Sequence, residues 1–176
     1  MKTTKKGFTL IELIVVIAII GVLAAILVPS MLGYVRKSKV SSANSTASSI
    51  YKAVNSALTE LDEEGVDIGG TIVLNKTVGV GSTTWSITAT SNSAITTAAN
   101  KSSLEKKILN FFSDLKKVKG AAVAVIEDGS CVAVGVCLDS TYTGTYPGGV
   151  VTTDTYKSYK GNAALAATKA KSIADV

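Results

Sequence analysis

Residues 5–28 read KKGFTLIELIVVIAIIGVLAAILV, and this stretch determines how the rest of the chain is organised. The run from Phe8 to Val28 is apolar except for one charged residue, Glu12. As an α-helix rising about 1.5 Å per residue, such a run is roughly 30 Å long, which is the thickness of the hydrocarbon core of a bilayer. The run therefore predicts a helix that crosses a membrane.

Basic residues flank this run on both sides. Lys2, Lys5 and Lys6 precede it, and Arg36, Lys37 and Lys39 follow it. Cytoplasmic segments close to a membrane span are enriched in Lys and Arg. Because Lys5 and Lys6 adjoin the run while Arg36 lies beyond Pro29, we expect the N-terminus to be cytoplasmic.

The acidic residue distinguishes the run from an ordinary secretory signal peptide. Signal peptides have uncharged apolar cores of about 7–15 residues followed by a cleavage site of small residues. This run is longer and carries Glu12 in its second turn. An acid inside a membrane segment is costly and is a functional candidate that needs a positive partner. The alternative interpretation is an acid tolerated near the lipid headgroups.

The motif Lys5-Lys6-Gly7-Phe8-Thr9-Leu10-Ile11-Glu12, followed by the apolar run and Pro29, resembles the N-terminus of a type IV prepilin. The resemblance covers roughly residues 1–35. It implies that a prepilin peptidase cuts between Gly7 and Phe8 and that Phe8 is then N-methylated. It also implies that Glu12 pairs with the Phe8 amine of a neighbouring subunit during filament assembly. In an apolar filament core, such a pair would fix the register of subunits because unpaired buried charges are strongly penalised.

The resemblance also implies a division of the chain into three parts. Residues 1–7 would be the leader peptide, and residues 8–29 would be the hydrophobic helix of the membrane and the filament core. Residues 30–176 would form the globular domain, which includes the amphipathic second half of the same helix. Removal of the leader discards three lysines and reduces the formal net charge from +5 to +2, since 15 basic and 13 acidic residues remain.

The helical pattern continues beyond the apolar run. Apolar residues recur at spacings of three and four from Val40 to Leu61, and Gly65 supplies a stop signal, so we expect one helix over residues 8–62. Gly21 and Pro29 interrupt its first half. The residues alone favour a kink there. The resemblance adds a second possibility, in which the stretch between Gly21 and Pro29 unwinds when the subunit joins a filament.

The rest of the sequence predicts a small α+β domain, with the long kinked N-terminal helix packed on an antiparallel sheet. We expect strands at 71–75, 84–90, 121–126 and 131–138, the last two joined by a hairpin at Asp128-Gly129. Residues 92–100 and 142–149 are expected to be loops. A capping box from Ser102 to Glu105 predicts a helix that ends at Gly120, and Asn162 is expected to cap a final helix reaching about Ala174.

Cys131 and Cys137 lie six residues apart in one predicted strand. An uninterrupted strand would place them on the same face roughly 20 Å apart, which is too far for a disulfide. We therefore predict free buried thiols and no disulfide. This differs from the C-terminal disulfide loop found in many pilins.

Several classes of function are excluded or disfavoured by the remaining residues. The chain has no histidine, which removes Ser-His-Asp and Cys-His nucleophile systems and all histidine metal sites. The acidic residues from Glu60 to Asp67 do not match a calcium-binding loop and indicate a solvated helix end. No aromatic stacking platform is evident near the lysines between Lys101 and Lys119, so we interpret them as a solvated helix face. We expect no enzyme activity, no cofactor, no metal and no nucleic-acid partner.

The sequence hypothesis is therefore a structural subunit of a type IV pilus. It would be held in the cytoplasmic membrane as a single-pass protein and polymerised with identical subunits into a surface filament for adhesion, motility or biofilm formation. Its partners would be the prepilin peptidase and methyltransferase and a pilus assembly platform. One alternative is a pseudopilin of a type II secretion or competence DNA-uptake system. Another is a binding protein anchored by one span, with an accidental match to the leader motif.

Overall fold

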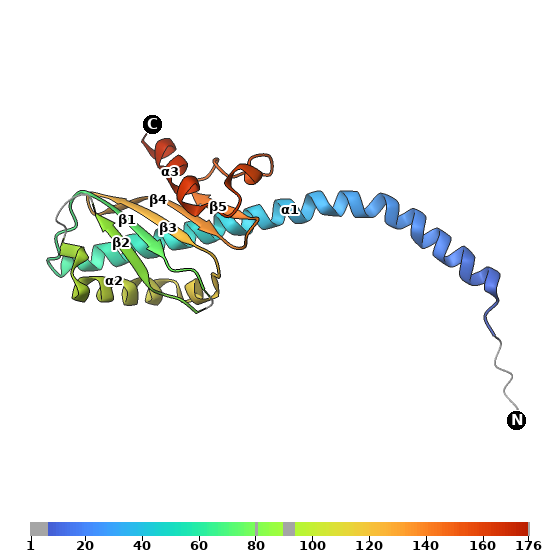
Figure 1. Ribbon diagram of the computed structural model, residues 1–176, viewed down its shortest axis with the longest axis horizontal. Helices are drawn as coiled ribbons and strands as arrows, with labels where there is room; N and C mark the ends of the chain where they lie inside the picture. Colours follow the sequence, from blue (N-terminus) through green and yellow to red (C-terminus); the bar gives the residue numbers. More distant parts are fainter. Residues whose placement is uncertain (1–6, 80, 90–93, 176) are drawn as a thin grey trace, which may run out of the picture. The chain divides into compact units, whose positions relative to one another are not determined.

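The computed structural model describes residues 7–79, 81–89 and 94–175 (Figure 1). The chain divides after Lys37 into an N-terminal segment and a globular unit that begins at Ser38. One helix, α1 (Leu10–Glu63), contributes residues to both parts.

The helix expected over residues 8–62 is confirmed as α1, which continues without a break through Gly21 and Pro29. Its C-terminus has the hydrogen bonds of a Schellman motif. The amide of Gly65 donates to the carbonyl of Asp62 at 2.9 Å, and the amide of Val66 donates to Leu61 at 3.0 Å. Gly65 has φ +80°, a conformation that costs glycine little, which explains why the helix stops there.

The globular unit contains one five-stranded antiparallel sheet with strand order β2-β1-β3-β4-β5. The strands are β1 (Thr71–Lys76), β2 (Trp85–Ala89), β3 (Ala122–Glu127), β4 (Ser130–Cys137) and β5 (Thr143–Tyr146). The predicted hairpin between β3 and β4 is confirmed. Asp128 and Gly129 have φ of +44° and +81°, as a two-residue type I′ turn requires.

The two faces of the sheet are buried under different helices (Figure 1). On one face, α1 between Ala47 and Leu61 and α2 (Ala98–Phe111) form one apolar core with side chains of β1, β3 and β4. On the other face, α3 (Ala163–Ala174) packs on β3 and β4 together with Val150, Val151 and Tyr156. The predicted α+β fold, with a long N-terminal helix on a small antiparallel sheet, is therefore confirmed.

Two polar side chains of α1 attach the helix to β4 and β5. The Oδ1 of Asn44 accepts a hydrogen bond from the amide of Thr145 at 2.9 Å, and its Nδ2 donates to the carbonyl of Val151 at 3.0 Å. The Oδ1 of Asn55 accepts from the amide of Cys131 at 2.9 Å. Residues eleven apart return to nearly the same side of an α-helix, so Asn44 and Asn55 act on one face.

The predicted helix after residue 100 begins and ends earlier than expected. Residues 94–100 were expected to be a loop, but they contain a short 3₁₀ helix, η1 (Ala94–Thr96), and the start of α2. Thr97 is the N-cap, and its hydroxyl accepts the amide of Asn100 at 3.4 Å. The predicted capping box at Ser102 is wrong, because Glu105 instead accepts the amide of Trp85 from β2 at 2.8 Å. Residues 92 and 93 of the predicted loop lie outside the described residues.

The same helix stops at Phe111 rather than at Gly120. The next turn tightens into a 3₁₀ helix, η2 (Ser113–Lys117), which keeps Leu115 buried although the register of the α-helix is lost. Phe111 continues the apolar spacing of the buried Leu104 and Ile108 but is 47% exposed. The apolar spacing therefore identified most of the buried residues but not the type of helix.

The loop expected over residues 142–149 contains the edge strand β5. Strands are recognised in a sequence by alternating apolar and polar residues. The sequence of β5, TGTY, lacks this alternation, because polar residues, Thr143 and Thr145, occupy its buried positions. Gly144 lies against α1. A Cβ atom on Gly144 would be 2.1 Å from the backbone carbon of Ala43, so only glycine permits this approach.

The two cysteines lie on opposite faces of the sheet, which corrects the prediction that they share one face. A β-bulge shifts the register so that Val125 pairs with Ala133 while Ile126 pairs with Cys131, and Val132 has no opposite residue. The extra residue reverses the alternation of side chains. Cys131 consequently packs in the core beneath α1, and Cys137 packs in the core beneath α3.

One buried charged residue was not anticipated from the sequence. Lys76, at the end of β1, is 3% exposed, and its Nζ donates to the carbonyls of Val118 at 3.0 Å and Thr77 at 3.2 Å. Burial lowers the pKa of Lys76 because it disfavours the charged form. The ammonium group joins the end of β1 to the chain that leaves η2.

We predict that Gly144→Ala destabilises the globular unit by about 1–3 kcal/mol or more, since the added methyl group must displace the backbone of α1. Gly148→Ala is the matched control, because a Cβ atom at Gly148 has nothing within 4 Å. Urea unfolding of both variants in detergent checks this. Equal midpoints for the two variants would show that the contact between α1 and β5 is not tight.

Candidate assembly site at the start of α1

The N-terminal part of α1 exposes all of its large apolar side chains. From Phe8 to Val35 these side chains are between 46% and 77% exposed. The most apolar 18-residue window of α1 has a mean hydropathy of 3.2, and among the described residues α1 alone has the length and composition to cross a membrane. Burying a side chain of this kind is worth about 2 kcal/mol. The segment therefore requires an apolar environment that its own chain does not supply.

The acid at the start of this segment forms a capping box with Thr9. The carboxylate atom Oε2 of Glu12 accepts the backbone amide of Thr9 at 2.8 Å and its hydroxyl at 2.5 Å. In return, the Thr9 Oγ1 accepts the amide of Glu12 at 3.4 Å. This reciprocal arrangement satisfies backbone N–H groups that otherwise lack partners at a helix start. Both bonds to the carboxylate use the same oxygen, so Oε1 remains available for another donor.

The peptide bond between Gly7 and Phe8 lies just outside the helix. Residues 7–9 have no regular secondary structure, and α1 begins at Leu10. Gly7 has open space around its Cα, with nothing within 4 Å of a Cβ placed there, and Phe8 is 77% exposed. The predicted cleavage bond is therefore accessible, and Phe8 lies one turn away from Glu12 along the chain.

The N-terminal segment thus has an exposed peptide bond between Gly7 and Phe8, followed by the capped acid Glu12 and a long apolar helix with exposed side chains. A family described as the prokaryotic N-terminal methylation motif matches residues 2–28. Over this segment the chain is similar to type IV pilins. The resemblance that the sequence motif indicated is thereby confirmed.

The curated relatives of the chain are named as fimbrial or pilin proteins. A type IV major fimbrial protein FimA of Dichelobacter nodosus is 45% identical over 67 residues, which are 38% of this chain and 42% of the relative. The type IV major pilin protein PilA of Myxococcus xanthus is 46% identical over 57 residues, 32% of this chain and 26% of the relative. A fimbrial protein of Pseudomonas aeruginosa is 48% identical over 56 residues, 32% of this chain and 36% of the relative.

The chain thus spans less than half the length of each of these relatives. No solved structure matches it. The family motif covers residues 2–28, all of which precede the globular unit.

The predicted site residues fall into three separate places. Gly7, Phe8 and Glu12 come together at the start of α1, while Gly21 and Pro29 lie inside the unbroken helix. The thiols of Cys131 and Cys137 are both unpaired and buried in the globular unit. Burial raises the pKa of Cys131 to about 12, so this thiol stays protonated at neutral pH and is a poor nucleophile.

Sequence reasoning missed the role of Thr9 in this site. The pattern Thr9-Leu10-Ile11-Glu12 is itself a capping-box signature, since a Thr is followed three residues later by a Glu before an apolar run. The resemblance implied a partner for Glu12 in a neighbouring subunit, and it did not predict the hydrogen bonds between Glu12 and Thr9. The signal was therefore present in the sequence.

The acidic residues at the end of α1 form a structural ion pair. The Nζ of Lys107 lies 2.8 Å from Glu60 and 2.8 Å from Glu64, joining α2 to α1. The hydrogen bond to Glu60, followed by that to Glu64, raises the pKa of Lys107. Its contribution to stability is therefore present at neutral pH and is lost as the pH rises through the raised value. Within the described residues, no group of acids and cysteines has the arrangement of a metal site.

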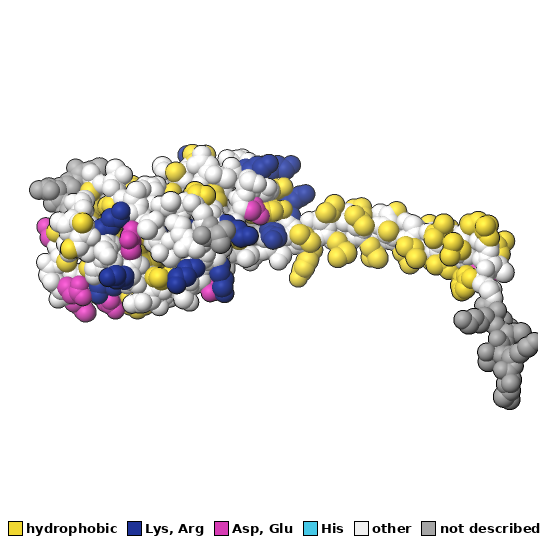
Figure 2. All heavy atoms as spheres, turned by 60° about the horizontal axis from the view of Figure 1, so that its bottom comes forward, with side chains coloured by type: hydrophobic (Ala, Val, Ile, Leu, Met, Phe, Trp, Pro, Cys, Tyr) yellow, Lys and Arg dark blue, Asp and Glu magenta, His cyan; other side chains and the backbone are white. Residues whose placement is uncertain are grey.

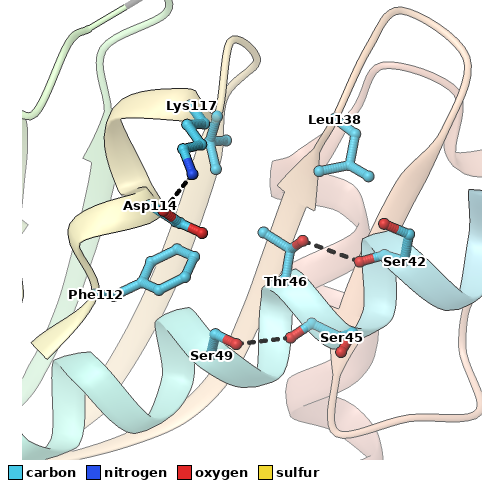
Figure 3. A pocket seen from close by; sticks show the side chains of 9 residues that line it. Ser42, Ser45, Thr46, Ser49, Phe112, Asp114, Lys117 and Leu138 are labelled. Atoms are coloured by element: carbon cyan, nitrogen blue, oxygen red, sulfur yellow. Dashed lines mark hydrogen bonds and ion pairs between the residues drawn. The ribbon is translucent and has the colours of Figure 1, made fainter.

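An open groove of about 340 Å³ lies between α1 and η2 (Figure 3). Its α1 side carries Ser42, Ser45, Thr46 and Ser49, and the opposite side includes Phe112 and the ion pair of Asp114 with Lys117. Thr46 and Ser49 donate to carbonyls one turn earlier in α1, at 2.9 and 3.1 Å. These hydroxyl groups are already engaged, so the groove has the character of a solvated surface.

We predict that Thr9→Ala loosens the first turn of α1, because it removes one of the two donors to the Glu12 carboxylate and the acceptor for the Glu12 amide. Loss of an N-cap side chain costs about 1 kcal/mol. Amide hydrogen exchange of residues 10–13 in detergent should be about fivefold faster in this variant. Thr9→Ser retains the hydroxyl and should exchange like the unchanged chain, and equal exchange for all three would contradict the capping role.

Proposed function

We propose that this chain is the structural subunit of a type IV pilus, held in the cytoplasmic membrane by its N-terminal helix and then polymerised with identical subunits. The observation that carries the proposal is the combination of the methylation motif with an apolar helix that the chain leaves wholly exposed. Such a helix needs lipid before assembly and neighbouring helices after assembly. No catalytic group is required of the chain, whose role would be to be processed and assembled.

The processing step would be carried out on this chain by a prepilin peptidase. Cleavage between Gly7 and Phe8 would remove residues 1–7 and convert the Phe8 nitrogen from an amide into an amine, which would then be N-methylated. The exposure of Phe8 and the open space at Gly7 suit an enzyme that must bind the chain in extended form.

The new amine would be the positive partner of Glu12 in a neighbouring subunit. The capping box supports this assignment, because Thr9 occupies only Oε2 of the carboxylate and leaves Oε1 for a second donor. Thr9 would keep the carboxylate in place while the subunit is alone in the membrane. On assembly, the intersubunit pair would select the register in which both charges are satisfied.

The relatives favour a pilus subunit over a pseudopilin. Those named above are described as major fimbrial, major pilin or fimbrial proteins. A pilus subunit would be exposed at the cell surface and would require an assembly platform in the membrane. Adhesion, motility and biofilm formation are the functions that such a filament would serve.

Intact mass spectrometry of the chain produced in a host with a prepilin peptidase tests the processing step. We expect a mass that corresponds to Phe8–Val176 plus one methyl group. Gly7→Val should leave the leader in place, because a branched side chain would enter the open space that the peptidase needs. A mature mass for that variant, or an uncleaved mass for the unchanged chain, would contradict the proposal.

Two substitutions of Glu12 separate its two roles in assembly. Glu12→Gln keeps an oxygen that can accept the Thr9 bonds but removes the charge, whereas Glu12→Ala removes both. If the charge pair drives assembly, both variants are cleaved and inserted normally but give no filaments by electron microscopy. Filaments of normal number from Glu12→Gln would show that capping alone explains the acid.

A further inference from the structure

The globular unit has one end at which basic side chains predominate. We define its proximal end as the end at which α1 begins its path along the sheet, at Ser38–Thr46. The ends of β3 and β4 and the segment around η2 meet there, because Ser42 of α1 shares a groove with Lys117 and Leu138. Figure 2 shows Lys and Arg side chains gathered at this end of the unit and a group of acidic side chains at the opposite end.

Contacts place six lysines at or beside the proximal end. Lys117 and Lys119 line cavities next to Leu138. Lys157 and Lys160 belong to the segment that precedes α3. This segment is held at the proximal end by Tyr156, which belongs to the same buried cluster as Val40 of α1, and by Gly161, which lines the same cavity as Lys119. The six are Lys39, Lys116, Lys117, Lys119, Lys157 and Lys160, and all are exposed.

The acids near these lysines do not neutralise them. Asp114 pairs with Lys117 at 2.8 Å. Asp139 accepts the amides of Thr141 and Tyr142, each at 2.7 Å, and Asp154 is an exposed loop residue. Six lysines less three aspartates leave a formal charge of +3. Among the described residues, the other five lysines have no ion pair.

The basic end follows the apolar segment directly along the chain. Lys39 follows Val35, the last of the exposed apolar residues, by four positions, and Arg36 and Lys37 lie between them. No acidic residue occurs from Pro29 to Thr59. If the apolar helix spans a bilayer, the proximal end is therefore within a few helical turns of the lipid headgroups.

We propose that the proximal end of the globular unit binds anionic phospholipid headgroups while the subunit is held in the membrane. This inference rests on the proposed function for its membrane location, but it assigns a surface that filament assembly does not explain. Basic residues near an anionic membrane surface each strengthen association about fivefold, and the attraction falls off within a Debye length. The surface would hold the globular unit on the bilayer until assembly removes the subunit from it.

The test uses the full chain incorporated into nanodiscs, with phosphatidylcholine alone or with added phosphatidylglycerol. Amide hydrogen exchange is followed in residues 113–120 and 156–161. We expect exchange in both segments to be several-fold slower with phosphatidylglycerol. At about 1 M salt, where the Debye length is about 3 Å, the difference should disappear.

Two double variants with the same change in charge supply the control. Lys119→Gln with Lys160→Gln removes two proximal lysines, neither of which has an ion pair. Lys106→Gln with Lys169→Gln removes two exposed lysines from α2 and α3. The first pair should abolish most of the phosphatidylglycerol effect, and the second should retain it.

Three outcomes would overturn the proposal. They are equal exchange in the two lipids, equal loss in both double variants, or protection that depends on the number of chains per nanodisc and not on the lipid. The last would indicate that the acidic end of a second copy covers this surface. None of these affects leader cleavage or filament formation, whereas a chain that fails to enter nanodiscs would contradict the proposed function as well as this inference.

Discussion

The large apolar side chains in the first half of α1 are exposed, and the proposed function follows from this exposure. Each large apolar side chain from Phe8 to Val35 is about half exposed or more. At about 2 kcal/mol for each side chain, no rearrangement of a small globular unit could offset leaving this segment in water. The segment must be surrounded by lipid or by other copies, and this need links the fold to the proposed function.

The second half of the same helix has the opposite property. From Ala47 to Leu61 its apolar face is buried against the sheet, and Asn44 and Asn55 bind backbone groups of β5 and β4. Asn44 also occupies the amide of Thr145 on the outer edge of the sheet, which protects that edge from pairing with another strand. One helix is thus both the scaffold of the globular unit and the element that must find partners.

Long periodic signals in the sequence predicted the structure well. The spacing of apolar residues predicted α1, and Gly65 predicted where this helix stops, two residues after its last residue, Glu63. The Asp128-Gly129 pair correctly predicted the hairpin between β3 and β4, because only a few residues adopt the two positive φ angles of that turn. Asn162 was correctly predicted as the cap of α3, accepting the amide of Leu165 at 2.9 Å.

Features that depend on distant contacts could not be read from the sequence. Glu105 resembles the end of a capping box, yet it binds the amide of Trp85, twenty residues earlier. The sequence of β5 does not alternate between apolar and polar residues. Its buried positions hold threonines, and the backbone of Ala43 in α1 lies so close to Gly144 that only glycine fits there. The bulge at Val132 arises from the pairing of β4 with β3. The spacing of the two cysteines in the sequence therefore could not predict that they lie on opposite faces of the sheet. At the candidate site, by contrast, Gly7, Phe8 and Glu12 were identified from a local motif, and Thr9 belonged to the same motif.

The proposed assembly depends on a pair between the Glu12 carboxylate at the start of this helix and the Phe8 amine that leader cleavage would create. The direct test is a structure of the assembled filament at side-chain resolution, which gives the distance from the Glu12 carboxylate of one subunit to the Phe8 nitrogen of its neighbour. We expect about 3 Å, the length of a charge-assisted hydrogen bond, with Thr9 on the other carboxylate oxygen. A filament in which Glu12 faces away from every Phe8 nitrogen would rule this pair out.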